Sequence, residues 1–291
     1  MALSDHRSLI VDSINGTPRG GQKGKPDALN FSLGDGLVIP QSRSISKLAL
    51  RGVNFSLRIN LTKNPLVRLL LIPNLARMLT SLLLSISFKE LIAIKVCRGV
   101  GFDSSIRQSF LNTFYVGYFQ SYKWLEIAQR KAKITFALEE FSSALEDFKS
   151  LAEVEQPLVV HVRLGDYLAE NGFGTPDKSY YEEAIQKALS TKKFRKIWLF
   201  SDDPQGALLK MPANLDIDVR VMPDFGGSSA ATLEAMRFGK GYVIGNSTFS
   251  WWGATLSYIS EPMVIYPYPW FKTLDVPVDL VPPHWTSVDA F

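Results

Sequence analysis

The sequence has a single cysteine, Cys97, and only three histidines, His6, His161 and His284, which lie far apart. One cysteine cannot form a disulfide within the chain, and histidines at this spacing do not suggest a zinc cluster. These shortages exclude a disulfide scaffold and a cysteine-based metal site. A reducing compartment is the natural expectation.

Long apolar runs are also scarce. Residues 1–30 are polar and glycine-rich, so we expect no secretory signal there. The most hydrophobic stretch, residues 65–88, is interrupted by Arg68, Pro73 and Arg77, and it lacks the roughly 20 apolar residues of a spanning helix. We expect a buried or half-buried helix pair; the alternative is a basic amphipathic surface that touches a membrane. The predicted location is cytoplasmic, with peripheral contact to the inner membrane as the open alternative.

A strong excess of one charge is missing too. The 32 Lys and Arg against 28 Asp and Glu give a net charge of +4, and the basic residues are scattered rather than striped. This is not the footprint of a nucleic-acid-binding protein, although it suits a small anionic ligand. What the chain does have is 46% apolar residues among 291, enough to bury a core in one large domain or in two of about 140 residues.

Strand and helix patterns alternate regularly from about residue 156. Continuous β-branched runs indicate buried strands, and amphipathic segments follow them. The strand patterns cover 156–167, 196–204, 214–223, 242–250 and 262–269, and the helix patterns cover 179–193, 232–241 and 251–260. This alternation predicts a parallel, doubly wound α/β domain over residues 156–291.

The preceding part of the chain is less regular. We expect short strands at 8–12 and 36–40 and a helical segment over 65–96. The aromatic segment 109–128 predicts a strand that runs into a helix beginning near Tyr122, and helical spacing continues over 124–152.

Candidate clusters follow four of the predicted strands, and three of the clusters are polar. The four are Arg163–Tyr167, Ser201–Asp203, Pro223–Ser229 and Asn246–Ser250. Ligands of open α/β sheets bind outside the carboxyl ends of the strands. We therefore expect these clusters to converge on one site.

The string GNSTFSWWGA places a hydroxyl-rich turn between a strand and a helix. A helix N-terminus offers free N–H groups and a partial positive charge, which together bind phosphate. Ser247, Thr248 and Ser250 would add hydroxyl donors. The alternative is that one of them simply caps the helix. A cap accounts for one hydroxyl and leaves the others unexplained, so we favour a binding turn.

The string HVRLGDY ends a buried strand with an arginine, a glycine turn and an acid. The Arg163 guanidinium could bind phosphate oxygens and stabilise a departing diphosphate. The alternative is a structural Arg163–Asp166 pair beside a core histidine, His161. After the next strand, Asp202 and Asp203 could accept hydrogen bonds from a ribose or a guanine edge, or form a turn before the following proline.

The D-x-D pattern of Asp216 and Asp218 resembles a metal-binding motif of some glycosyltransferases. Both carboxylates are expected on the solvated side of an alternating strand, and we favour that interpretation. No metal site is predicted.

With HVRLGDY, FSDD and GNSTFSWWGA in this order, the chain resembles the bacterial α-1,2-fucosyltransferases of glycosyltransferase family 11. The segment 117–125, GYFQSYKWL, and the block from Glu234 to Ser257 extend the likeness. STFSWWGA is very specific, whereas H-x-R-x-G-D also occurs in other families that use GDP-fucose. The resemblance implies a GT-B type α/β architecture of two Rossmann-type domains. The acceptor-side domain, 1–155, would be incomplete or irregular and helix-rich, and 156–291 would bind the nucleotide sugar.

The resemblance also implies an activity. This is an inverting, metal-independent transfer of L-fucose from GDP-β-L-fucose to the 2-hydroxyl of a galactoside in a surface glycan or O-antigen precursor, with no cofactor. The implied catalytic residues are Arg163, on the β-phosphate, with His161 and Asp166, which build its turn and are both candidates for the base. The implied substrate-binding residues are Asp202 or Asp203 at the guanosine, Ser247, Thr248 and Ser250 at the diphosphate, and Asn246 and Trp251 in the same turn.

The chain departs from the family pattern in two places. The usual opening strand and G-G-x-G-N-Q loop have no counterpart, since RGGQKGKP at 19–26 lacks a strand before it, and the chain is expected to begin at the second strand. Thr232 replaces a usual acid, and 239–241 replace a usual Cys-Lys-His. The alternatives are therefore a remnant that binds GDP without catalysis, or a fucosyltransferase of another linkage.

Overall fold

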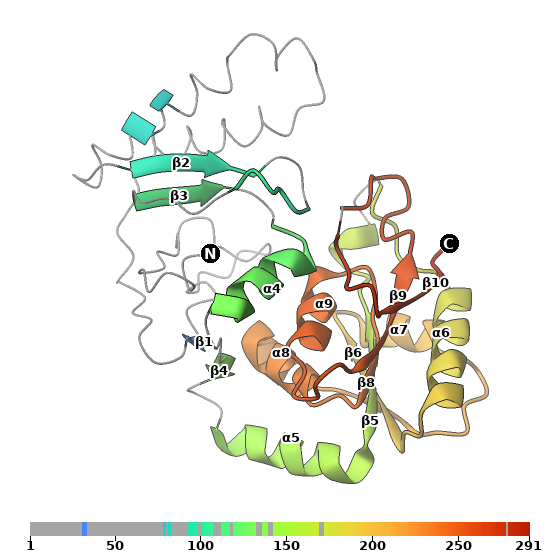
Figure 1. The fold of residues 1–291 in the computed structure, drawn as a ribbon. Coiled ribbons are helices and arrows are strands. Elements are labelled where there is room, and N and C mark those ends of the chain that lie inside the picture. Colours follow the sequence, from blue (N-terminus) through green and yellow to red (C-terminus); the bar gives the residue numbers. More distant parts are fainter. Residues whose placement is uncertain are drawn as a thin grey trace. The chain divides into compact units, whose positions relative to one another are not determined.

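The structure is a computed structural model, and two compact units make up the chain (Figure 1). The first unit comprises residues 1–29, 33–136 and 277–282, and the second comprises 30–32, 137–276 and 283–291. The described residues are 31–33, 78–79, 81–82, 92–97, 101–106, 112–116, 119–131, 136–138, 142–168, 172–277 and 279–291. The boundary expected after residue 155 stays a prediction.

In the first unit, two short strands pair in parallel ahead of a helix. They are β2 (Ile92–Val96) and β3 (Asn112–Val116), followed by α4 (Tyr122–Lys131). The expected strand and the helix beginning near Tyr122 are confirmed. Trp124 of α4 packs on Phe102, with ring centroids 4.7 Å apart. No helix in the described ranges is long and apolar enough to cross a membrane.

Two helical predictions before residue 155 are wrong in part. The segment expected to be helical to residue 96 ends in strand β2, because IAIKV places the β-branched residues Ile92, Ile94 and Val96 at every second position, the period of a strand. The spacing over 124–152 is broken by strand β4 (Phe136–Leu138), which pairs with β1 (Phe31–Leu33), before α5 (Ser142–Glu155). The strands expected at 8–12 and 36–40 lie outside the described residues.

The second unit contains a six-stranded, fully parallel sheet in the order β10-β9-β8-β5-β6-β7. Its strands are β5 (Pro157–Val162), β6 (Lys196–Ser201), β7 (Val219–Val221), β8 (Gly241–Val243), β9 (Met263–Tyr268) and β10 (Thr286–Asp289). The predicted parallel, doubly wound α/β domain is confirmed. Strand β10 was not predicted.

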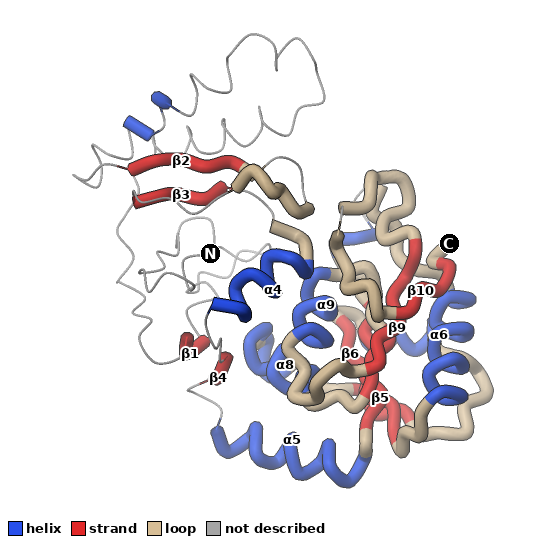
Figure 2. The backbone as a smooth tube through the Cα atoms, viewed as in Figure 1, coloured by secondary structure: helices blue, strands red, loops and turns tan. Residues whose placement is uncertain are grey.

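Helices cover both faces of this sheet (Figures 1 and 2). The pair α6 (Lys178–Thr191) and α7 (Pro204–Lys210) lies on one side, and α8 (Ser229–Arg237) and α9 (Thr248–Thr255) lie on the other, with α5 against α8. Short 3₁₀ turns at Asp166–Leu168 (η3) and Phe225–Gly227 (η4) complete the unit. Helix α7 was not predicted from the sequence.

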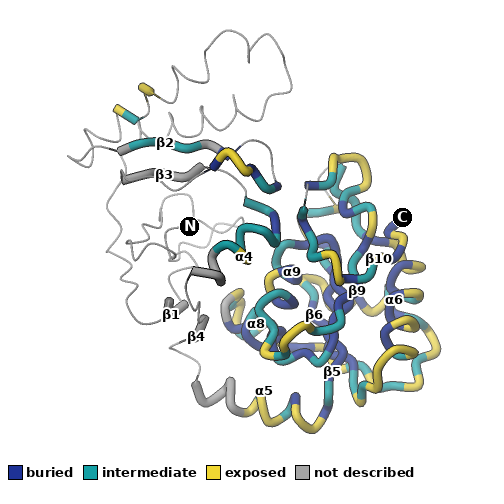
Figure 3. The backbone as a smooth tube through the Cα atoms, in the orientation of Figure 1, coloured by how far each residue is buried: buried dark blue, intermediate teal, exposed yellow. Residues whose placement is uncertain are grey.

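Burial explains why the central strands read as continuous apolar runs. Every residue of β5 is buried, and the buried parts of the sheet lie between the two helix layers (Figure 3). Tyr180 and Tyr181 of α6 are fully buried, and their hydroxyls donate to the carbonyls of Ile244, at 2.5 Å, and His161, at 3.4 Å. These hydrogen bonds hold the carboxyl ends of β8 and β5 against α6.

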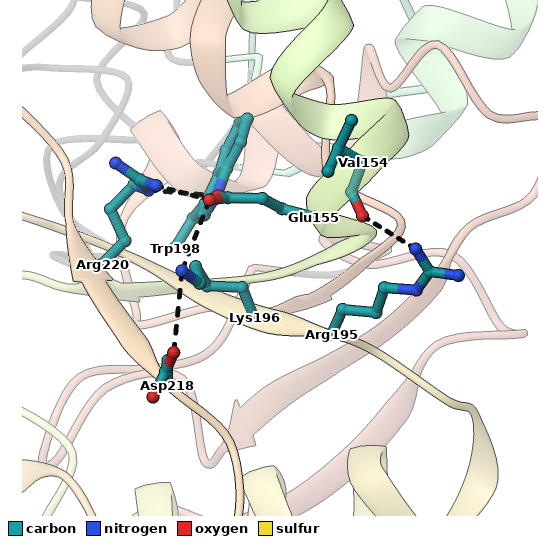
Figure 4. A network of polar contacts seen from close by, with 7 residues as sticks. All are labelled: Val154, Glu155, Arg195, Lys196, Trp198, Asp218 and Arg220. Carbon is teal, nitrogen blue, oxygen red and sulfur yellow. Dashed lines mark hydrogen bonds and ion pairs between the residues drawn. The ribbon is translucent and has the colours of Figure 1, made fainter.

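A polar network closes the opposite end of the sheet (Figure 4). The carboxylate of Glu155, at the end of α5, accepts hydrogen bonds from the Trp198 indole at 2.6 Å and from Arg220 Nη2 at 2.5 Å. Lys196 Nζ lies 3.5 Å from the same carboxylate and 3.8 Å from that of Asp218. The network joins α5, β6 and β7, since each supplies at least one of these side chains.

The strand order reverses between β5 and β8. The chain proceeds from β5 outward through β6 to β7 and then returns to the other side of β5 as β8. The segments that follow β5 and β8 therefore leave on different faces of the sheet. Such a switch point is where open α/β sheets bind their ligands.

Candidate functional site

Arg163 is the first residue after β5, and Asp202 is the first after β6. Because Val162 pairs with Ser201 in the register of the two strands, the two side chains are neighbours. Arg163 Nη1 lies 3.2 Å from Asp202 Oδ2, and the Leu164 amide donates to Asp202 Oδ1 at 3.0 Å. Gly165 makes this approach possible, since a Cβ there would lie 2.3 Å from Asp202 Oδ2. Asp202 therefore orients the guanidinium of a side chain that is still one-third exposed.

The turn after β8 lies directly beside the end of β5. A Cβ at Gly245 would be 3.1 Å from the His161 carbonyl and 3.7 Å from the Arg163 amide, so a larger residue would be crowded there. The Phe249 ring of α9 lies 6.0 Å from the His161 ring. The structure thus places the backbone at the end of β5 beside Gly245, two residues before Ser247. That the Arg163 guanidinium and the Ser-Thr turn bind one ligand stays a prediction.

The hydroxyls of the turn divide between two tasks. Ser247 caps α9, because its Oγ accepts a hydrogen bond from the Phe249 amide at 3.3 Å. Ser250 is fully buried, and its Oγ donates to the carbonyls of Ser247 at 3.1 Å and Gly245 at 3.4 Å. These two hydroxyls therefore shape the turn. Thr248, the half-buried first residue of α9, stays a predicted phosphate donor together with the first-turn N–H groups other than that of Phe249.

Asn246 and Trp251, both expected to bind substrate, are packed into the protein. The Asn246 amide is fully buried and donates to the carbonyls of Gly174 at 2.9 Å and Phe173 at 3.3 Å. Trp251 is 4% exposed and lies edge-on to Trp252 at 4.9 Å. Trp251 thus anchors α9, while Asn246 ties the turn to another loop.

His161 is buried beneath the site. It is 4% exposed, and its Nδ1 has no hydrogen-bond partner among the described residues. Burial, assisted by the charge of Arg163, lowers the pKa of His161 from 6.5 to about 3. A neutral imidazole of such low basicity is a poor acceptor for a sugar hydroxyl proton at neutral pH. The buried position of His161 fits the other role expected for it, which is to shape the turn that carries Arg163. The backbone of Asp166, the other candidate base, begins η3, and its side chain lies outside the described residues.

The buried His161 should make the free energy of unfolding depend on pH in the acid range. Because its folded-state pKa lies below the ordinary 6.5, the contribution is complete above pH 6.5 and is lost as the pH falls from 6.5 towards 3. The loss approaches about 1.4 kcal/mol per pH unit for one proton. We expect His161→Asn to flatten the dependence of the unfolding free energy on pH, measured by urea unfolding between pH 7 and 4. Equal slopes for the two proteins would contradict this assignment.

The remaining predicted clusters have mostly structural roles. Asp203 caps α7, since its Oδ1 accepts from the Gly206 amide at 3.1 Å, so the turn alternative holds for this residue. Ser228 caps α8 in the cluster after β7. The Asp218 side chain is 85% exposed, as expected, although Asp216 and Asp218 precede β7 rather than lying in it.

Sequence reasoning missed a set of stacked aromatic side chains at this edge. Tyr167 packs on Phe173 with ring centroids 5.0 Å apart, and Phe173 stacks on Phe271 at 5.2 Å. The guanidinium of Arg163 lies 5.8 Å from the Tyr167 centroid. Phe173 stands between Gly172 and Gly174, and these two glycines are the only nearby sequence feature that could have drawn attention to it. Phe271 is distant in sequence. We call Tyr167, Phe173 and Phe271 the aromatic column.

Comparison with known proteins gives a consistent result. Residues 103–273 match the family described as Glycosyl transferase family 11. The O-antigen biosynthesis glycosyltransferase WbnK of Escherichia coli is 32% identical over 127 residues, which is 42% of this chain and 42% of the relative. The alpha-1,2-colitosyltransferase of Escherichia coli is 22% identical over 180 residues, 60% of this chain and 62% of the relative. Both alignments span less than two thirds of the relative's length.

Proposed function

The chain belongs to glycosyl transferase family 11, and from this premise we propose that it transfers L-fucose from GDP-β-L-fucose to the 2-hydroxyl of a galactoside in an O-antigen or surface glycan precursor. The observation that supports the proposal is that the backbone of Arg163 lies beside Gly245, two residues before the cap of α9, at the switch point of a parallel sheet. A cation and a helix N-terminus at one edge form a receptor for a diphosphate.

In the proposed mechanism, the protein mainly stabilises the leaving group. As the bond from the sugar to the nucleotide breaks, negative charge grows on the diphosphate, and donors already oriented towards it lower the barrier. Arg163 would supply a charged donor held by Asp202, and Thr248 with the first-turn amides of α9 would supply neutral ones. With these donors the transfer would need no metal ion, and the acceptor hydroxyl would attack from the opposite side, inverting the configuration.

The domain arrangement is part of the same proposal. The second unit would bind the nucleotide sugar and the first would contribute to the acceptor side, in a GT-B layout. Because the proposed acceptor is a surface glycan precursor, the protein would act at the cytoplasmic side of the inner membrane, where such precursors are assembled.

One relative suggests a second donor. Since that relative is an alpha-1,2-colitosyltransferase, GDP-colitose is the alternative sugar nucleotide, with the same linkage. The diphosphate site described above would serve either donor, because it involves no contact to the sugar ring.

Nucleotide release tests the proposal. Purified protein is incubated with GDP-fucose, GDP-colitose, GDP-mannose or UDP-galactose, with and without a galactoside, in the presence of EDTA. We expect release of GDP from one of the first two donors, stimulated by the galactoside and unaffected by EDTA. Calorimetry with GDP runs alongside. Binding without release would indicate a non-catalytic GDP-binding protein, and neither binding nor release would refute the proposal.

A further inference from the structure

The guanidinium of Arg163 is restrained from two directions. Asp202 holds Nη1 at 3.2 Å, and the Tyr167 ring lies 5.8 Å from the guanidinium carbon. A cation near an aromatic face is attracted by the negative charge of the ring face. Tyr167 is in turn supported by Phe173, and Phe173 by Phe271. The aromatic column is therefore a backing for the arginine.

The column is fixed in place by backbone contacts around Phe173. The Phe173 carbonyl accepts hydrogen bonds from the Lys272 amide at 3.0 Å and from Asn246 Nδ2 at 3.3 Å. Asn246 also holds the Gly174 carbonyl, at 2.9 Å. Gly172 and Gly174 have φ values of +103° and +66°, which side chains other than glycine rarely adopt. The position of Phe173 is thus specified from both sides.

Asn246 belongs to the turn that begins α9, so its hydrogen bonds to the Phe173 and Gly174 carbonyls join that turn to the aromatic column. The residue after it, Ser247, caps α9. One side chain therefore links the helix N-terminus to Phe173, and the aromatic column continues that link to Arg163. The two elements that would bind the diphosphate are connected by a continuous path of contacts.

We infer that Phe173 and Asn246 are positioning residues. They act through Tyr167 to hold the Arg163 guanidinium in a fixed position relative to the N-terminal turn of α9. The inference rests on the proposed function, because it assigns this fixed position to the binding of a diphosphate. Without the column, Arg163 would keep its ion pair with Asp202 but lose its contact with a Tyr167 ring held in place, and its guanidinium would become more mobile. A flexible arginine must then be ordered in each catalytic cycle, which costs rate.

A double-mutant cycle tests this inference. We expect Phe173→Leu to lower kcat for nucleotide release about tenfold with little change in the KM for the galactoside, and Phe173→Tyr to retain most activity. In an Arg163→Ala background the same Phe173→Leu change should alter kcat less than about twofold, because residues that act through one group are not additive. The matched control is Phe194→Leu, which removes a half-buried ring 5.9 Å from Lys192 Nζ, near the other end of the sheet.

The outcomes separate this inference from the proposed function. An equal loss from Phe173→Leu in both backgrounds overturns the positioning role. If the wild-type protein releases no nucleotide, the readout becomes the mobility of Arg163 itself, from nitrogen-15 relaxation of its Nε–Hε group, assigned by its loss in Arg163→Lys. Phe173→Leu and Asn246→Ala should each increase that mobility, and Phe194→Leu should not. Unchanged mobility would overturn the inference independently of any activity.

Discussion

Replacing Arg163 with alanine is expected to lower the rate of nucleotide release by about 10²–10³-fold, the effect of removing one principal donor to a developing oxyanion. Its guanidinium is oriented by Asp202, and the side chain is one-third exposed at the carboxyl edge of the sheet, where it can reach a ligand. The loss should appear mainly in kcat, since the charge on the leaving group is largest in the transition state. Steady-state GDP release with saturating donor measures it.

Two companion variants sharpen this prediction. Arg163→Lys keeps the charge but cannot form a paired contact with phosphate, so its rate should be intermediate. Arg195→Ala removes an exposed arginine at the start of β6, where its Nη1 donates to the Val154 carbonyl at 3.3 Å, and should leave the rate unchanged. Near-normal turnover of Arg163→Ala would show that this arginine is not the principal donor.

Replacing Glu155 with alanine is expected to reduce the free energy of unfolding by about 2–4 kcal/mol. The change would leave the buried Trp198 indole N–H without its acceptor at 2.6 Å. Arg220 and Lys196, which share the Glu155 carboxylate, would lose their common counter-charge (Figure 4). Urea unfolding followed by tryptophan fluorescence measures the effect. The matched control is Glu153→Ala, an exposed acid on the same helix, which should change stability little.

The same carboxylate predicts a pH dependence. Burial raises the pKa of Glu155, but the hydrogen bonds from Arg220 and Trp198 and the nearby cations together outweigh burial and lower it. Its contribution is therefore complete above the ordinary carboxyl pKa and is lost as the pH falls through the lowered value in the folded state. In Glu155→Ala this acid-dependent loss should be absent. A pH dependence identical to that of the wild type would contradict the assignment.

The sequence predicted the second unit well because its signals are local. Strands such as β5 are buried on both faces and read as continuous apolar runs, so each was recognisable without knowledge of its neighbours. The alternation of strands and helices predicted a parallel sheet with its ligand site at the carboxyl ends of the strands, whereas the switch point between β5 and β8 comes from the observed strand order. Arg163 and the turn at Ser247 could therefore be assigned to one sheet edge from the sequence alone.

The individual roles at that edge could not be predicted in the same way. Ser250 and Thr248 look equivalent in the sequence, yet the i−3 geometry of a helix turns the Ser250 hydroxyl back onto the Ser247 carbonyl. The partner of Asn246 is a loop some seventy residues earlier in the chain. Before residue 155, the helical prediction over 65–96 was wrong at β2. A segment of five residues is too short for the apolar period of a strand to be told from that of a helix.

The order of strands has a consequence for biosynthesis. Arg163 and Asp202 emerge from the ribosome early, whereas the turn at Ser247 is made only after the chain has passed through β7 and returned to the centre of the sheet. A ligand that bridges the two would find half a receptor on any nascent chain that stops short of β8. Occupancy by such a ligand would therefore report synthesis at least as far as the turn before α9, and a chain break anywhere between α7 and β8 would leave the two halves of the receptor on different fragments.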